Sequence, residues 1–112
     1  MGGQPSHEGG VKDEKTKKAE VAYQDLQNRW LKACMTLDEL GKPQWKRTTE
    51  AMVCFKKLNI THMPQRWRQR LDQTFLQINT VTEKYPIETW EDYQNVSPED
   101  LAKIGALIRK ML

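Results

Sequence analysis

The clearest pattern in the chain is an apolar stripe between residues 47 and 63. Its members recur at steps of three and four residues, and they are Ala51, Met52, Phe55 and Leu58. This spacing places them on one face of a helix, while the polar residues between them fall on other faces. We therefore predict an amphipathic helix over residues 44–58 that ends at the Asn-Ile-Thr segment 59–61.

Similar stripes predict a long helix before this one. Over residues 16–40 the stripe consists of Tyr23, Leu26, Trp30, Cys34, Leu37 and Leu40. Gly41 follows where a left-handed C-terminal cap belongs, and Pro43 comes two residues later. The next helix then begins after only about three residues, so we expect the two helices to be neighbours.

Two more helices are predicted towards the C-terminus. One begins after residue 61 or 62 with Pro64 in its first turn, and it ends before Pro86. Its stripe is Trp67, Leu71, Phe75, Ile78, Val81 and Tyr85. The other begins with Ser97 as N-cap and Pro98 at the first position. Its stripe is Leu101, Ile104, Ile108 and Met111, and the connector 86–96 has room for one helical turn.

The predicted fold class is all-α: a compact bundle of four to five helices over residues 16–112. No segment shows the alternation of apolar and polar residues that is typical of a half-buried strand. Residues 1–15 contain four glycines, one proline and no apolar periodicity. We expect them to form a disordered N-terminal tail.

Charge is distributed unevenly along the chain. The net charge is only +3, yet residues 29–70 carry ten basic and three acidic residues, whereas residues 71–112 carry four basic and seven acidic ones. Such asymmetry favours a positive surface that meets an acidic partner. We assign the steering role to Arg29, Lys32, Lys46 and Arg47.

Candidate catalytic chemistry is absent from the pattern. Cys34 and Cys54 lie on the apolar sides of their helices, which is typical of buried free thiols, and His7 and His62 are wrongly spaced to complete a metal site with them. There is no glycine-rich phosphate loop, no apolar run of membrane-spanning length and no apolar signal region near the start. We expect no metal, no cofactor and a binding module instead of an enzyme.

Two alternative functions have a basis in the residues. Arg66, Arg68 and Arg70 flank Trp67, a pattern that can bind nucleic acid if the ring stacks on bases, although Trp67 also lies on the core stripe. The start of the chain matches the N-myristoylation pattern with Gly2 as the acceptor. An N-myristoylated membrane-associated adaptor or a viral matrix-like protein is therefore a further alternative, although acidic residues interrupt the lysines that follow and membrane binding is not the expected mode.

The connector before the last helix carries aromatic and apolar residues among acidic ones. Tyr85, Ile87, Trp90 and Tyr93 lie in this segment. Apolar residues on a loop beside a rigid bundle make a good peptide-docking site. The equally weighted alternative is that Trp90 and Tyr93 only pin the loop to the core.

The central stretch resembles a known family. The residues that carry the resemblance are Arg47, Glu50, Ala51, Met52, Phe55, Leu58, Ile60, Thr61 and Met63. They are similar to the second helix and following turn of integrase-binding domains of the lens epithelium-derived growth factor type. Those domains belong to the wider group of helical modules like the N-terminal domain of the transcription elongation factor S-II.

The resemblance implies a nuclear, chromatin-associated module of transcription regulation that binds short, disordered, acidic and aromatic-bearing motifs. Two inter-helix loops would receive the partner, and they correspond here to Leu40–Trp45 and Tyr85–Trp90. In the family an aspartate in the first loop accepts hydrogen bonds from the partner backbone, but counting back from Arg47 places Gly41 there, and Asp38 and Glu39 are predicted inside the helix. The expected partner-binding residues are therefore Leu40, Lys42, Trp45, Lys46, Arg47, Tyr85, Ile87 and Trp90, with the oligomeric state left open.

Overall fold

The fold is entirely helical, as the sequence predicts. A computed structural model of the 112-residue chain describes the backbone of residues 3–112 and the side chains of residues 14–112. Within that part there is no strand, and the elements in order are α1 (Gly3–Leu37), α2 (Gln44–Val53), α3 (Gln65–Thr82), the 3₁₀ helix η1 (Trp90–Asn95) and α4 (Pro98–Arg109). The predicted turn in the connector is therefore confirmed as η1.

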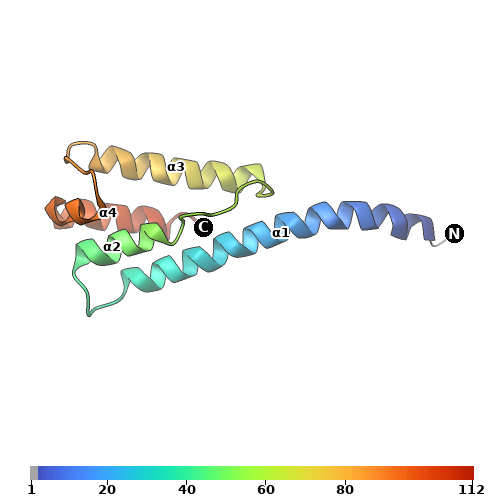
Figure 1. Cartoon of the computed structure of the whole chain (residues 1–112), viewed down its shortest axis with the longest axis horizontal. Coiled ribbons are helices and arrows are strands. Elements are labelled where there is room, and N and C mark those ends of the chain that lie inside the picture. The colour runs from blue at the N-terminus through green and yellow to red at the C-terminus, as the bar shows by residue number, and fades with distance from the viewer. Residues whose placement is uncertain (1–2) are drawn as a thin grey trace.

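Helix α4 lies at the centre of the arrangement. It packs against α1, α2 and α3, and α2 also contacts α1 and η1. Figure 1 shows α3 on one side of α4, with α1 and α2 on the other. Helix α1 extends beyond the bundle on its N-terminal side, whereas the α1–α2 and α3–η1 loops both lie at the opposite end (Figure 1).

The core consists of the predicted stripes with a few additions. Its most completely buried large side chains are Leu26, Ile78, Ile104, Ile108 and Met111. Each removes apolar surface from water, and this removal is the main favourable term in folding. Ala22 and Ala33 are also buried, and such small residues let α1 approach its neighbours closely. Trp30 is half-buried, and its Nε1 donates to the carbonyl of Ile108 at 2.8 Å, which ties α1 to α4.

The predicted disordered tail, residues 1–15, falls mostly outside the described side chains. Residues 1 and 2, and therefore the proposed acceptor Gly2, lie outside the described residues altogether. Glu14 and Lys15 belong to α1, so the predicted helix start at residue 16 is too late for these two. The backbone of residues 3–13 also falls within α1, which begins at Gly3.

Helix α1 ends at Leu37, three residues earlier than predicted. The amides of Asp38 and Glu39 bond back over three residues, to Met35 and Thr36, so the chain tightens and leaves the helix. Gly41 does not adopt the left-handed conformation that the sequence predicts for it. Leu40 therefore lies in the α1–α2 loop and is 92% exposed.

Helix α2 ends at Val53, five residues before the predicted end. Arg29 of α1 explains this early end, because its Nη1 donates to the carbonyls of Cys54 at 3.0 Å and Lys56 at 2.6 Å. These carbonyls then need no further helical turn to satisfy them. Lys57 takes a left-handed conformation with φ 58°, which turns the chain away while Phe55 remains buried.

The bounds of α3 differ slightly from the prediction, whereas the start of α4 agrees with it. Pro64 stands just before α3 as its N-cap, not inside the first turn, and α3 ends at Thr82, before the predicted end at residue 85. The predicted start of α4 is confirmed. The Ser97 side chain accepts a hydrogen bond from the amide of Asp100 at 3.2 Å, and Pro98 occupies the first helical position.

Candidate functional site

Tyr85 is part of a partly buried polar network at the loop end of the bundle. Its hydroxyl donates to Oδ2 of Asp100 at 2.6 Å and accepts from the amide of Ser97 at 3.2 Å. Lys84 reaches the same carboxylate at 3.0 Å. The Tyr85 hydrogen bond, followed by Lys84, lowers the pKa of Asp100 to about 2. Tyr85 therefore locks the connector onto the start of α4, and its hydroxyl already has two partners.

The next turn of the connector is held by Asp92. Its carboxylate accepts hydrogen bonds from the amides of Glu88 at 2.7 Å and Thr89 at 2.9 Å. These two bonds hold the pKa of Asp92 below its usual value, because they favour the charged form. The loop that leads into η1 is consequently fixed at both ends by side-chain carboxylates.

Trp90 is the exposed aromatic residue on this fixed loop. Its side chain is 40% exposed and stacks on Tyr93, which is only 8% exposed, with ring centroids 5.7 Å apart. Nζ of Lys56 lies 5.8 Å from the Trp90 ring. Ile87 is half-buried and packs against the core. Tyr93 therefore pins the loop to the core, as one of the two sequence-based alternatives predicted for both aromatic residues. Trp90 instead remains partly exposed to solvent.

The other predicted residues lie in the α1–α2 loop and the first turn of α2. Trp45 is half-buried against the core, and Lys46 is exposed. Lys42 pairs with Glu39 at 3.0 Å and Glu50 at 2.7 Å, and the hydrogen bonds to Glu50 and then Glu39 raise the pKa of Lys42. The Lys42 charge is therefore balanced within the chain and contributes little to steering.

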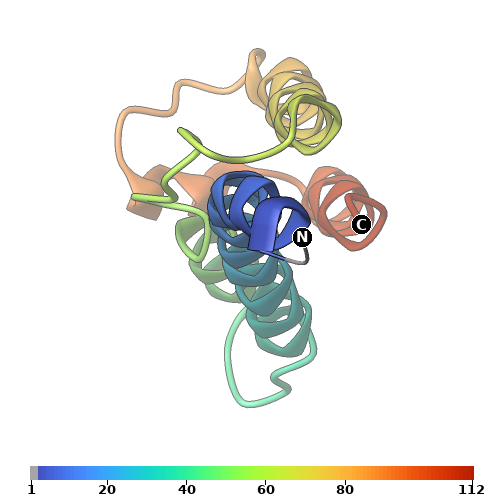
Figure 2. The same cartoon turned by 90° about the vertical axis from the view of Figure 1, so that its right-hand side faces the viewer.

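The two loops share one end of the bundle but not one cavity. Gln44 Nε2 donates to the carbonyl of Pro98 at 3.1 Å, which joins the start of α2 to the start of α4. Figure 2 shows the α1–α2 loop and the α3–η1 loop on different sides of the molecule. A ligand that contacts both loops would have to reach across this end of the bundle.

A cleft of about 280 Å³ lies beside the α1–α2 loop. Its walls come from the end of α1, the start of α2 and one face of α4: Leu37, Gln44, Arg47, Thr48, Leu101, Ala102, Gly105, Ala106 and Arg109. Arg47 donates through Nη1 to the carbonyl of Leu37 at 3.2 Å, and its buried Nε has no hydrogen-bond partner. Sequence reasoning missed this cleft because the α4 wall lies far from Arg47 in the sequence.

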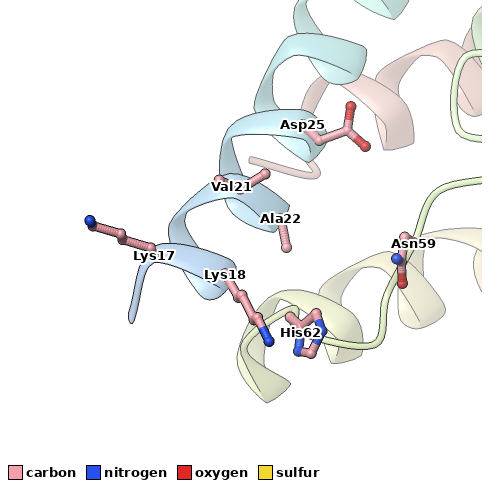
Figure 3. Close-up of a pocket in the computed structure, with 7 residues that line it drawn as sticks. All are labelled: Lys17, Lys18, Val21, Ala22, Asp25, Asn59 and His62. Carbon is pink, nitrogen blue, oxygen red and sulfur yellow. The ribbon is translucent and has the colours of Figure 1, made fainter. Parts of the chain in front are cut away.

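A larger cavity of about 410 Å³ lies between α1 and the segment before α3. Figure 3 shows Lys17, Lys18, Val21, Ala22 and Asp25 on one helix, with Asn59 and His62 on the opposite segment; Lys18 and Ala22 point towards that segment, whereas Lys17 points away from it. Val21 is 68% exposed, and Asp25 is already paired with Arg29 at 3.1 Å. No spacing in the sequence pointed to this juxtaposition, since it depends on how far α1 extends past the bundle.

The predicted steering residues are not equivalent. Arg29 caps the end of α2, and Arg47 bonds to the last carbonyl of α1, so both support the fold. Lys32 and Lys46 are exposed. We therefore assign the long-range attraction of an acidic partner to Lys32 and Lys46, because their charges are exposed, and not to the two arginines.

The three arginines of the nucleic-acid alternative do not share one face. At 100° per residue, Arg68 lies about 160° around α3 from both Arg66 and Arg70. The Arg66 guanidinium lies 4.6 Å from the Trp67 ring, and Arg70 Nη1 donates to the carbonyl of Met111 at 3.2 Å. Trp67 is half-buried and packs on Tyr23 with centroids 4.9 Å apart, in agreement with the core interpretation.

The cysteines are free thiols, and both are half-buried, less enclosed than the sequence predicts. Burial is the main cause that raises the pKa of Cys34. The described residues contain no cluster of three or more candidate metal ligands. None of their helices combines the length and apolarity that crossing a membrane requires.

Comparisons with protein-family models, with curated proteins and with solved structures find no match for this chain. The resemblance to integrase-binding domains therefore stays a prediction based on the residues of the central stretch.

Proposed function

We propose that this chain is a non-enzymatic interaction module that binds short, disordered, acidic and aromatic-bearing motifs of transcription or chromatin regulators. The observation that carries the proposal is Trp90, which is 40% exposed on a loop that hydrogen bonds hold in place. Exposed tryptophans on rigid supports are frequent anchors of binding energy. A nuclear location follows from the kind of partner and is part of the same proposal.

Rigidity of the loop supports this role. Tyr85, Asp92 and Asp100 fix the connector through side-chain hydrogen bonds before any partner arrives. A preordered loop loses little conformational entropy when it binds, so more of the contact energy appears as affinity. An acidic partner would also find Lys56 beside the Trp90 ring.

The α1–α2 loop, on another side of the same end of the bundle, also supports the proposal. Leu40 is 92% exposed, and it offers apolar surface at the same end of the bundle. The early end of α1 also places Asp38 outside the helix, where its side chain is 68% exposed. An aspartate that can accept hydrogen bonds from a partner backbone is therefore present in this loop, although not at the position of Gly41.

A peptide selection on the intact chain tests this function. A displayed library of twelve-residue peptides rich in Asp, Glu, Phe, Trp and Leu is selected for binding, and the best peptide is mapped by amide chemical shifts. We expect the largest shifts in residues 38–46 and 85–93. Trp90→Ala should weaken binding by roughly tenfold or more, as expected for a central aromatic anchor.

Leu76→Ala is the matched control, because Leu76 is 67% exposed on α3 and belongs to neither loop. It should leave the affinity unchanged. The proposal fails if no acidic peptide is selected, or if the shifts cluster elsewhere while Trp90→Ala binds as tightly as the original chain.

A further inference from the structure

We infer that the cleft between α2 and α4 is a subsite for a carboxylate, namely an acidic side chain of the docked peptide. This inference rests on the proposed function and assigns the chemistry of one contact within it. The cleft opens next to the α1–α2 loop and includes Arg47 and Arg109 in its walls. Two guanidinium groups in one small cleft favour an anion over any neutral or cationic group.

Arg47 supplies the unusual donor. Its Nη1 is committed to the carbonyl of Leu37, but its Nε is buried and has no hydrogen-bond partner. Buried polar groups almost always have partners, so Arg47, whose side chain lines the cleft, keeps one donor unused. A guanidinium is always charged, and the acceptor that suits it best carries negative charge.

Arg109 supplies the second cation. Its present partner is the carboxylate of Asp38, so this arginine already binds the kind of anion that we propose. Arg109 Nη2 lies 2.6 Å from Oδ1 of Asp38, and the two side chains are 45% and 68% exposed. This exposed pair is held weakly, because water and salt screen both charges. An incoming carboxylate can therefore share or replace Asp38 as the partner of Arg109 while it also reaches Arg47.

The shape of the cleft limits what enters. Between Leu101 and Arg109, α4 contributes Ala102, Gly105 and Ala106 to the wall, and none of these three projects a long side chain. A cavity of about 280 Å³ is large enough for one side chain but small for a whole drug-sized ligand. Arg109 already pairs with a carboxylate, that of Asp38, and the proposed partner is an acidic peptide, so we assign the subsite to Asp or Glu.

A fragment titration tests the subsite directly. The isotope-labelled intact chain is titrated with sodium phenylacetate, and the Nε–H resonance of Arg47 is followed by NMR. We expect a saturable downfield shift of this resonance. Phenylacetamide, which has the same shape without the charge, and sodium chloride at equal ionic strength should both leave it in place.

Variants of the wall make the test specific without disturbing Arg47. Ala106→Leu adds bulk to an exposed position in the cleft wall and should weaken phenylacetate binding at least fivefold. Lys103→Leu changes an exposed α4 residue outside the cleft and should have no such effect. Asp38→Asn removes the competing carboxylate and should strengthen binding about threefold.

The inference is overturned if the Arg47 resonance does not move, if phenylacetamide moves it equally, or if inorganic phosphate binds more tightly than phenylacetate. Its failure is distinguishable from failure of the proposed function. An acidic peptide that still requires Trp90 but leaves the Arg47 resonance unchanged removes the subsite alone. A chain that binds phenylacetate at Arg47 but selects no peptide retains the subsite and loses the function.

Discussion

Single residues show how the chain uses polar groups to hold its loops. The sequence placed Tyr85 on an apolar stripe and predicted that its ring packs on the bundle and helps to dock a peptide. In the structure its hydroxyl forms hydrogen bonds with Ser97 and Asp100, on the far side of the connector. That partnership depends on the path of the eleven residues between Tyr85 and Ser97, which no local pattern describes. Arg29 is similar, because its role at the end of α2 depends on residues more than twenty positions away.

Removal of the Tyr85 hydroxyl should destabilise the chain. Tyr85→Phe keeps the ring but leaves the nearly buried Asp100 carboxylate and the Ser97 amide each without one hydrogen bond. We expect a loss of about 1–2 kcal/mol in the free energy of unfolding, measured by urea denaturation at pH 7. Tyr23→Phe, which retains its ring against Trp67, is the control and should lose less.

The same variant should change the acid side of the stability curve. The pKa of Asp100 is lowered to about 2 in the folded chain from an ordinary value of 3.8, so its contribution is complete above about pH 4 and disappears as the pH falls through about 2. Tyr85→Phe removes the main cause of that shift. Stability measured between pH 5 and pH 2 should therefore fall less steeply in the variant, and an unchanged slope would contradict the assignment.

Helices and loops show where local signals are sufficient and where they are not. The start of α4 follows directly from Ser97 and Pro98, because an N-cap acts on amides only two or three residues away. The ends of α1 and α2 come earlier than their apolar stripes suggest. In both cases an arginine from another helix bonds the terminal carbonyls, and the chain leaves the helix there.

Lys57 allows a test of the backbone conformation that follows the end of α2. A non-glycine residue at φ 58° is strained, and glycine adopts this conformation freely. Lys57→Gly should therefore stabilise the chain by up to about 1 kcal/mol in thermal or urea unfolding. Lys56→Gly is the neighbouring control, since Lys56 lacks the positive φ, and it should give no gain.

The whole molecule presents its fixed loops at one end and a long helix at the other (Figure 1). The positive excess of residues 29–70 should guide acidic peptides to the loop end, but only exposed charges act at long range. Lys32→Glu with Lys46→Glu should slow association of the selected acidic peptide by roughly tenfold at low salt and much less at high salt. Stopped-flow fluorescence with a labelled peptide measures this rate.

The matched control reverses two charges far from the loops. Lys15→Glu with Lys17→Glu makes the same change in net charge on the N-terminal half of α1. This double variant should retain most of the association rate. Equal slowing by both double variants would show that net charge alone, and not the position of Lys32 and Lys46, governs the encounter.

The sequence by itself determined the helical class, the order of the helices and most of the core, because these depend on spacings within one or two turns. It also indicated Trp90 as an aromatic residue on a connector. Only the tertiary structure decided that Tyr93 is buried while Trp90 stays exposed, that Arg29 and Arg47 end two helices, and that Arg47 and Arg109 line one cleft. These outcomes depend on contacts between distant segments, and the geometry of such contacts is set by how the helices pack and not by the residues next to them in the chain.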